Sequence, residues 1–430
     1  MIQPKVLKGF RDSLPKQEIV KKKVINTLET VFSNFGFVPI DTPVLEYKEV
    51  LLGKAGGETD KQIFHFVDNG QREVALRFDL TIPFARFVAA NYNDLTFPFK
   101  RFHISKVWRG ENPQRGRFRE FFQCDFDIVG TDNENADLEI LIMMAQALKA
   151  LDISRFTIKV SHRNLFNNYL KTLNVDSEST EILRSVDKLA KIGKSEVFKL
   201  LVELVKEKTI ANSILDFISI GNLNNNQEAL KKLTELFGDK NEDLNRLKSI
   251  FNNLDELNIS DNFKIDTSIT RGLDYYTAIV FETFLDDLEE IGSICSGGRY
   301  NDLASLYTKH HLPGVGSSIG LDRLLAALEH LGHPLLAHPS SSDVLVINEG
   351  DEFNRKAQVV TNQLRGANIA TQYYLLEKKV LNQFKFAEQN NIPYALFLNK
   401  EAPYTLRDLQ KREDFSFSSV EEVIKHLKGN

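Results

Sequence analysis

The sequence is poor in cysteine, with only Cys124 and Cys295 among 430 residues. Two cysteines cannot build the disulfide framework of a small secreted protein or a cysteine-based zinc site, so we expect a reducing compartment. Apolar runs of about 18 residues are also missing, and the first residues, MIQPKVLKGFRDSLP, lack the apolar core of a signal peptide. We therefore expect a cytoplasmic protein with no membrane association.

The sequence also lacks the common phosphate-binding loops. No GK[ST] occurs, and glycines 314, 316 and 320 are spaced G-x-G-x-x-x-G, one residue away from the dinucleotide fingerprint. By itself, the run GVGSSIG is more typical of a glycine-mediated helix packing site. Its position before the predicted helix LDRLLAALEHLG places Arg323 in a first helical turn, where free N–H groups attract anions.

An excess of positive charge is missing too, because the formal net charge is −5. This balance excludes a general nucleic-acid coat protein. Between Lys100 and Arg119, however, seven Lys or Arg residues stand against the single acid Glu111. This local charge indicates either a phosphate-binding segment or a solvated basic face.

Hydrophobic periodicity predicts several elements in the first 160 residues. Helical spacing joins Val24, Leu28, Val31 and Phe35. Strand-like runs follow, namely FVPIDTPVLEY, EVALRFDLT, FKRFHISKVWR and RFREFFQCDFDIVG. We expect 109–117 to be the loop between the last two runs, which would then be antiparallel strands. The apolar segment 137–151 predicts a helix.

The composition changes after this region and then changes back. Residues 165–257 are rich in Lys, Glu and Leu with helical period, which predicts an inserted helical subdomain. Strand signals return in FKIDTSITRGLDYYTAIVFET and IGSICSGGRYNDL. Residues 333–342 have the Pro and Ser content of a linker, and beyond them strand and helix patterns alternate as in a small α/β domain.

Three arginines stand at the edges of strand-rich segments, Arg109, Arg271 and Arg323. A guanidinium keeps its charge and forms forked hydrogen bonds to phosphate oxygens, so three of them converging on one site would clamp a triphosphate. Taken one at a time, independent structural salt bridges are an equally good interpretation.

The motifs taken together resemble one enzyme family. WRGEN with RFREFFQCDFDIVG resembles the arginine-bearing second motif of class II aminoacyl-tRNA synthetases, GVGSSIGLDRL the third motif, and FGFVPIDTPVLEY the proline-bearing first motif. TRGLDYYTAIVFET and SGGRYNDL are similar to the two signatures of the histidyl-tRNA synthetase family. The resemblance extends from KGFRDSLP to TLRDLQKRE, almost the whole chain.

This resemblance implies a fold. We expect an α+β catalytic domain with a mixed, mainly antiparallel sheet flanked by helices, a helical insertion, and a C-terminal α/β anticodon-binding domain. The expected limits are residues 1–164 and 258–332 for the two parts of the catalytic domain, 165–257 for the insertion, 333–342 for the linker and 343–430 for the anticodon-binding domain.

The resemblance also implies a reaction, in which ATP activates L-histidine to histidyl-adenylate and the acyl group passes to tRNA(His). The implied catalytic residues are Arg109, Arg271 and Arg323. ATP would be bound by Arg109, Glu111, Arg117 and Arg323, with Mg²⁺ accompanying the nucleotide and no metal site made by the protein itself. Arg109 and Arg271 would hold the α-phosphate, Arg323 the distal phosphates and Glu111 the adenine end.

The histidine substrate would be bound by a polar pocket. By resemblance, Asp79, Thr81 and Gln123 surround the α-ammonium group, and Leu80 contributes its backbone. Asp127 and Tyr276 face the imidazole, and the remaining histidine-binding residues are Arg271, Tyr275 and Tyr300. The spacing agrees in one respect, because Gln123, Asp125 and Asp127 alternate along one predicted strand and share a face.

The expected partners are ATP, L-histidine, tRNA(His) and a second copy of the chain, since the first motif of the family builds a homodimer interface. A non-catalytic relative that regulates ATP phosphoribosyltransferase is the main alternative. That relative lacks the C-terminal domain and has eroded motifs, whereas RGLDYY and a full C-terminal region occur here. A class II synthetase of another specificity is disfavoured by the two histidine signatures.

Overall fold

The computed structural model describes residues 1–53, 62–113, 116–186, 188–223, 225–269, 276–337, 339–376, 378–398 and 404–429. The chain divides into two structural units. One is formed by Met1–Asp12 and Val24–Gly332, and the other by Ser13–Lys23 and His333–Asn430. Among the described residues, every helix is too short or too polar to span a bilayer.

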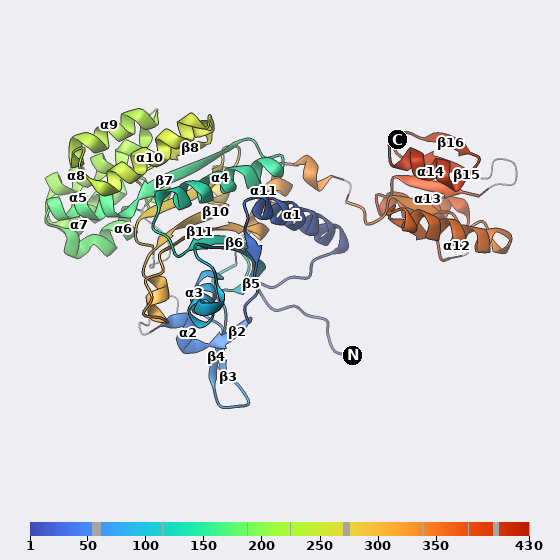
Figure 1. Cartoon of the computed structure of the whole chain (residues 1–430), viewed down its shortest axis with the longest axis horizontal. Helices are drawn as coiled ribbons and strands as arrows, with labels where there is room; N and C mark the ends of the chain where they lie inside the picture. The colour runs from blue at the N-terminus through green and yellow to red at the C-terminus, as the bar shows by residue number, and fades with distance from the viewer. Residues whose placement is uncertain are drawn as a thin grey trace. The chain divides into compact units, whose positions relative to one another are not determined.

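The first unit is built on an eight-stranded mixed sheet (Figure 1). In spatial order its strands are β1 (Val38–Pro39), β5 (Phe99–Trp108), β6 (Glu120–Val129), β11 (Gly314–Gly320), β10 (Cys295–Tyr300), β9 (Ile279–Leu285), β7 (Phe156–His162) and β8 (Phe263–Ile265). The pairs β1–β5 and β7–β8 are parallel, and the other five pairs are antiparallel. The expected mixed, mainly antiparallel sheet is therefore confirmed.

Helices cover this sheet and bury its apolar face. They are α1 (Pro15–Asn34), α3 (Thr81–Ala90), α4 (Glu134–Ala150) and α11 (Leu321–His330), whereas the short α2 (Lys48–Leu52) packs against α3. Phe32 of α1 packs against Phe102 of β5 and Phe126 of β6, with ring centroids 5.6 and 4.9 Å apart. All three rings are at least 95% buried, so they anchor α1 on β5 and on β6, the strand that carries Gln123 and Asp127.

The segment FVPIDTPVLEY was expected to form one strand but forms two short ones in different sheets. Val38 and Pro39 add β1 to the edge of the large sheet, whereas β2 (Leu45–Tyr47) joins β4 (Glu73–Leu76) and β3 (His65–Val67) in a separate antiparallel sheet. The physical reason is that Pro39 and Pro43 lack the N–H groups that one continuous ladder would need.

Six helices lie between β7 and β8 in the sequence and gather beside these strands (Figure 1). They are α5 (Arg163–Thr172), α6 (Ser179–Val186), α7 (Leu189–Val205), α8 (Lys208–Ser219), α9 (Asn226–Phe237) and α10 (Glu242–Glu256). The start of α9 is capped by Asn225 and that of α10 by Asn241, whose side-chain oxygens accept hydrogen bonds from Glu228 N and Leu244 N. The limits of a separate inserted domain stay a prediction.

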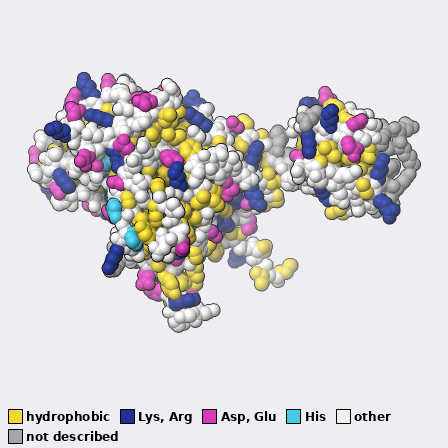
Figure 2. All heavy atoms as spheres, in the orientation of Figure 1, with side chains coloured by type: hydrophobic (Ala, Val, Ile, Leu, Met, Phe, Trp, Pro, Cys, Tyr) yellow, Lys and Arg dark blue, Asp and Glu magenta, His cyan; other side chains and the backbone are white. Residues whose placement is uncertain are grey.

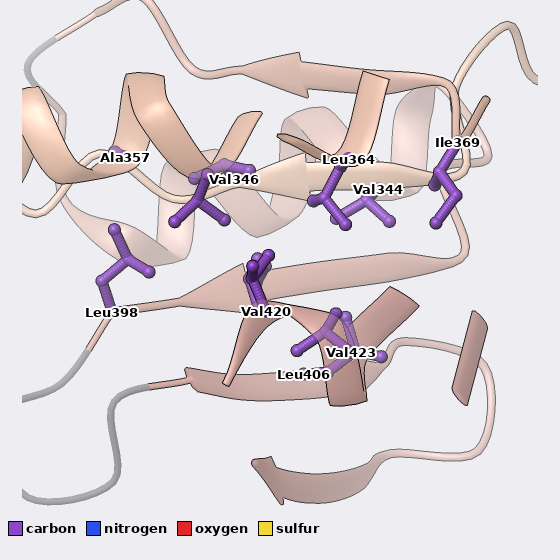
Figure 3. Close-up of a cluster of buried hydrophobic side chains, with 11 residues drawn as sticks. Val344, Val346, Ala357, Leu364, Ile369, Leu398, Leu406, Val420 and Val423 are labelled. Atoms are coloured by element: carbon purple, nitrogen blue, oxygen red, sulfur yellow. The ribbon is translucent and has the colours of Figure 1, made fainter. Parts of the chain in front are cut away.

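The second unit contains a five-stranded mixed sheet. Its strands, in spatial order, are β13 (Thr371–Tyr373), β12 (Val344–Val346), β14 (Tyr394–Phe397), β15 (Tyr404–Asp408) and β16 (Glu413–Phe417), and its helices are α12 (Asp351–Gly366), α13 (Val380–Gln389) and α14 (Val420–Leu427). The expected alternation of strand and helix is confirmed, and the antiparallel β14–β15–β16 and α14 complete the domain. Figure 3 shows one side of its core, where Val346 and Leu364 face Val420 and Leu406.

The run GVGSSIG does not pack helices together, as its composition alone suggested. It forms the whole of β11, a central strand held between β6 and β10. Gly314 and Gly316 are needed on the strand instead, because the side chains of Tyr300 and Asp127 occupy the space that their β-carbons would take. The helix expected after the run is confirmed as α11, with Arg323 in its first turn.

Candidate active site

A cavity of about 310 Å³ opens along β6, β10 and β11 of the first unit. Ten of the residues expected to bind ATP or histidine line it, namely Asp79, Thr81, Arg109, Glu111, Arg117, Gln123, Asp127, Tyr276, Tyr300 and Arg323. Leu80 does not line it, because its side chain is fully buried at the start of α3. Arg271 and Tyr275 lie outside the described residues.

The cavity follows the register of two strands. On β6, Gln123 lies opposite Gly320, the last residue of β11, and Asp127 lies opposite Gly316, further from α11. Because two residues of a strand advance by roughly 6.6 Å, Gln123 and Asp127 are separated by roughly 13 Å along β6. The cavity therefore has one part near the beginning of α11 and another part near Asp127.

The part near α11 is positively charged. Arg323 extends from the first turn of α11, and its Nη1 donates to the carbonyl oxygen of Ser293. Burial, together with the nearby charges of Arg117 and Arg109, lowers the pKa of Arg323 to about 10, against the opposing charges of Glu111 and Glu282. An anion placed here would relieve the mutual repulsion of three guanidinium groups.

Arg109 is fixed at the end of β5 by its backbone and its side chain. Its amide donates to the carbonyl oxygen of Arg119 at 2.9 Å, and its Nε donates to the carbonyl oxygen of Phe78 at 2.9 Å. The guanidinium also lies 5.2 Å from the ring centroid of Phe121 on β6. The side chain fixed in this way lines the cavity.

The segment KGFRD near the N-terminus holds this arginine-bearing region together. Gly9 accepts a hydrogen bond from the amide of Arg119 at 2.8 Å, and Arg11 forms an ion pair with Asp322 at the start of α11. Asp322 also accepts from the amide of Phe122 on β6 at 2.7 Å. The N-terminal segment, β6 and α11 are thus connected beside the cavity.

The opposite part of the cavity is acidic and deeply buried. Asp79, Asp125 and Asp127 are each at most 2% exposed, and the neighbouring Arg101 is fully buried. Asp127 pairs with Arg101 Nη2 at 2.7 Å and accepts a hydrogen bond from the hydroxyl of Tyr300 at 2.5 Å. Burial raises the pKa of Asp127, while Arg101 and Tyr300 oppose that rise.

Two other residues of this part are held by their backbone surroundings. Asp79 lies just before α3, where its Oδ1 accepts from the amide of Ile82 at 3.1 Å and satisfies a free donor of the first helical turn. Tyr276 is held by Arg163 of α5, whose Nη1 donates to its carbonyl oxygen at 3.0 Å.

Glycines make room for this polar part. A β-carbon on Gly316 would lie 1.9 Å from Oδ1 of Asp127, and one on Gly298 of β10 would lie 3.0 Å from the ring of Tyr276. Both distances are too short for real atoms, so the signature strands need glycine at these positions.

Comparisons with known proteins agree with this arrangement. A family model described as Histidyl-tRNA synthetase matches residues 9–324, and a model described as Anticodon binding domain matches residues 343–430. The chain belongs to the histidyl-tRNA synthetase family. It is 50% identical over 406 residues to the histidine–tRNA ligase of Treponema denticola, covering 94% of this chain and 90% of that protein. It is 44% identical to the ligase of Rhodopirellula baltica, over 92% and 90% of the two chains.

Solved structures of the histidyl-tRNA synthetase family have the same fold. The histidyl-tRNA synthetase of Nostoc sp. PCC 7120 superposes over all of both chains with a TM-score of 0.90 and 30% identity. A Bacillus halodurans protein described as an ATP phosphoribosyltransferase regulatory subunit/histidyl-tRNA synthetase has a TM-score of 0.74 over 92% of this chain and 98% of that one, but only 22% identity, so it shares the fold alone. The regulatory alternative is therefore not favoured.

Sequence reasoning missed several residues of the cavity. Asp125, Glu282 and Ser318 line it, although none was among the expected site residues. Asp125 could have been found, since its alternation with Gln123 and Asp127 was already apparent in the sequence. Ser318 was hidden because the register of β11 against β6, which places it opposite Asp125, does not follow from the sequence pattern.

Proposed function

We propose that the chain joins L-histidine to tRNA(His) in two steps. The histidine carboxylate attacks the α-phosphorus of ATP, pyrophosphate leaves, and histidyl-adenylate forms. A hydroxyl of the terminal ribose of the tRNA then attacks the acyl carbon, and AMP leaves. The observation that carries the proposal is that one cavity has a cationic part suited to a triphosphate and an acidic, hydrogen-bonding part suited to histidine.

In the cationic part, Arg109 would hold the α-phosphate and Arg323 the distal phosphates, with Arg117 assisting and Glu111 at the adenine end. Negative charge grows on the α-phosphate as the carboxylate attacks, so fixed guanidinium groups stabilise the transition state more than the ground state. Burial has already removed water from Arg323 before an anion binds. Its attraction to a phosphate is therefore screened less than it would be in bulk water. Arg271 is proposed as a second contact of the α-phosphate and of the substrate carboxylate.

Mg²⁺ would enter with ATP. Within the described residues no group of three or more His, Cys, Asp or Glu could hold a metal ion by itself. Phosphate oxygens and water can supply most of the six ligands that Mg²⁺ requires, and carboxylates such as those of Glu111 and Glu282 line the same cavity. The ion would neutralise phosphate charge, while the arginines orient the nucleotide.

In the acidic part, Asp79, Thr81 and Gln123 would bind the α-ammonium group, with Leu80 acting through its backbone. Asp127 and Tyr276 would contact the imidazole, and Tyr275 and Tyr300 would complete the walls. Competitors without a matching polar ring would leave these buried groups unpaired, which discriminates by about 10⁴-fold or more. The ion pair with Arg101 supports this role, because it favours the charged carboxylate and opposes the rise that burial causes in the pKa of Asp127.

The proposed assembly is a homodimer. Six exposed hydrophobic side chains lie on β1, β2, β3 and the turn before β2, and we call them the apolar patch: Val38, Val44, Leu45, Tyr47, Phe66 and Val67. Figure 2 shows hydrophobic side chains gathered on this region of the first unit. The patch belongs largely to the segment that resembles the first motif of the family, and a second copy of the chain is its proposed partner. The cytoplasmic location stays a prediction.

Charging of tRNA with labelled histidine tests the proposed function. With ATP and Mg²⁺, we expect acid-precipitable label on total bacterial tRNA that depends on the enzyme, and no label with the other amino acids. Histidine binding without charging would favour the regulatory alternative, and charging by another amino acid would contradict the proposed specificity.

A further inference from the structure

Asp125 has no assigned role, yet it lies between two proposed histidine-binding residues. It shares the cavity face of β6 with Gln123 and Asp127, and it is 1% exposed. Ser318 on β11, directly opposite in the register, donates a hydrogen bond to it. Oδ1 of Asp125 has no hydrogen-bond partner among the described residues.

The neighbouring Gln123 also has a buried acceptor oxygen that receives no hydrogen bond from the described residues. Its Nε2 donates to Oγ of Ser318 at 3.0 Å, while its Oε1 is buried and also lacks a partner in the described part of the chain. Ser318 therefore links the two residues, because its hydroxyl oxygen accepts from Gln123 and its hydroxyl proton is donated to Asp125. Two buried acceptors are left facing the cavity, and buried acceptors without donors are costly in a folded protein.

The charges around this point do not balance. Three carboxylates, those of Asp79, Asp125 and Asp127, are at most 2% exposed, and the two guanidinium groups beside them, Arg77 and Arg101, are equally buried. Both arginines interact electrostatically with Asp125. Among these five described groups the carboxylates outnumber the guanidinium groups by one, so a ligand that brings one positive charge and several N–H donors fits this part of the pocket.

We propose that Asp125 is a second carboxylate for the α-ammonium group of bound histidine, acting together with Asp79. This inference rests on the proposed function, because it assigns a further specificity residue to the same pocket. The ammonium group has three N–H donors, and Asp79, Gln123 and Asp125 offer three acceptors to them. The imidazole is left to Asp127, whose carboxylate already interacts with Arg101 and Tyr300.

The state of Asp125 then depends on pH. Burial, together with repulsion from Asp127 and Asp79, raises its pKa to about 7, against the attraction of Arg101 and the hydrogen bond from Ser318. The charged and polar groups around Asp125 come from four segments of the first unit. They are Ser318 on β11, Gln123 and Asp127 on β6, Arg101 and His103 on β5, and Arg77 and Asp79 between β4 and α3. Burial, with Arg101 and Arg77, lowers the pKa of His103 to about 3, so His103 is neutral at pH 6–8.

The sign of the pH effect follows from these groups. Below pH 7 the free enzyme carries a neutral Asp125, which cannot pair with an ammonium ion. Above pH 7 the carboxylate is charged while the ammonium is still protonated, so the affinity for histidine increases. Histidine also titrates by itself, and comparison with a variant that lacks the Asp125 charge cancels that contribution.

The test uses histidine-dependent ATP–pyrophosphate exchange by the full-length enzyme, with Asp125→Asn and the wild type compared between pH 6 and 8. At pH 8 we expect the KM for histidine to rise by about tenfold or more in the variant, because a charged hydrogen bond is lost. The KM for ATP should change little. The histidine KM of Asp125→Asn divided by that of the wild type should fall towards one at pH 6, where the wild-type Asp125 is mostly neutral.

A substrate analogue identifies the group that Asp125 contacts. 3-(Imidazol-4-yl)propionate lacks the α-amino group, so its inhibition constant should be unchanged or improved in Asp125→Asn. An equal loss of affinity for histidine and for the analogue in Asp125→Asn would overturn the assignment to the ammonium group. An unchanged histidine KM would overturn it too. Asp125→Ser removes the same charge and provides a second variant if the first does not fold.

A matched control is Asp408→Asn, which removes a carboxylate that is 6% exposed in the other structural unit and should leave the histidine KM unchanged. The outcomes also separate the two proposals. If the wild type performs no histidine-dependent exchange, the proposed function fails. If the wild type is active and both variants bind histidine like it, only the role of Asp125 is wrong.

Discussion

At the scale of single residues, the proposed histidine pocket depends on the position of one carboxylate. Asp127 is held by Arg101 and Tyr300 from two different strands, and it occupies the space that a side chain at position 316 would need. Arg101 is itself packed against the ring of Phe84, with 4.3 Å between its guanidinium carbon and the ring centroid. The direction of Asp127 is therefore set by packing and not only by charge.

A methyl group at position 316 should disturb this carboxylate. In Gly316→Ala the new β-carbon would displace Asp127, so we expect the KM for histidine to rise by about tenfold or more, with a smaller change in the KM for ATP. Pyrophosphate exchange measures both constants. Gly366→Ala is the control, because nothing lies within 4 Å of its added β-carbon. Unchanged histidine kinetics in Gly316→Ala would remove Asp127 from the pocket.

The buried Asp125 should also affect stability. Its folded-state pKa of about 7 is higher than the ordinary value of 3.8, so the folded protein binds the proton more tightly than the unfolded chain does. The ionised carboxylate therefore costs stability progressively from about pH 4 to pH 7, and the cost is complete above pH 7. We expect Asp125→Asn to raise the Tm of the free enzyme by several degrees at pH 8 and by less at pH 5. A larger gain at pH 5, measured by calorimetry, would contradict the pKa direction.

At the scale of secondary-structure elements, a buried ion network connects the inserted helices to the cavity. Asp137 of α4 is fully buried, accepts from Nε of Arg299 at 2.8 Å, and accepts from Nε of Arg246 on α10 at 2.6 Å. Arg299 precedes Tyr300 on β10, and its carbonyl oxygen accepts from the amide of Thr277 at 2.8 Å. One carboxylate thus joins α10, α4 and the strand that carries Tyr300.

Removal of the charge of Asp137 should destabilise this connection. Asp137→Asn leaves the buried guanidinium of Arg299 and the half-buried one of Arg246 with less compensation, at a cost of about 3 kcal/mol. We expect a lower Tm and a higher KM for histidine than for the wild type, with a smaller effect on the KM for ATP. Asp287→Asn is the control, because its pair with Arg155 is exposed and should contribute less than about 1 kcal/mol. Equal Tm values for the two variants would contradict the network.

The sequence predicted these elements unevenly. The hairpin of β5 and β6 and the helices α4 and α11 were clear, because apolar periodicity and a glycine-bearing loop mark them. The division of FVPIDTPVLEY between two sheets was missed, and so was the full extent of the strand that GVGSSIG forms. Both segments pair with strands that lie far away in the sequence, β1 with β5 and β11 with β6. A local pattern of prolines or glycines does not reveal such partners.

The candidate site was predicted by residue type better than by geometry. Motif resemblance identified the residues of the cavity near Arg323 and Asp127, and the structure brings ten of them together. It did not identify Ser318 or Arg101, whose importance comes from the register with β6. Positions 271 and 275 lie outside the described residues, so their roles stay predictions.

At the scale of the whole molecule, the apolar patch is the proposed dimer interface. Phe66 is 50% exposed on β3, so a charge there should oppose the burial that a stable dimer requires. We expect the wild type to sediment as a dimer at micromolar concentration and Phe66→Glu to shift towards the monomer. Leu381→Glu, at a leucine that is 65% exposed in the second unit, should remain dimeric. A monomeric wild type would contradict the assembly.

The central claim concerns the first unit as a whole, namely that one cavity holds ATP in its cationic part and histidine in its acidic part. The most direct test is the pair of KM values in pyrophosphate exchange for Asp127→Ala and Arg323→Ala. We predict that Asp127→Ala raises the KM for histidine by about tenfold or more with the KM for ATP nearly unchanged, and that Arg323→Ala has the opposite pattern. Equal effects of each variant on both substrates, or no histidine-dependent exchange by the wild type, would contradict it.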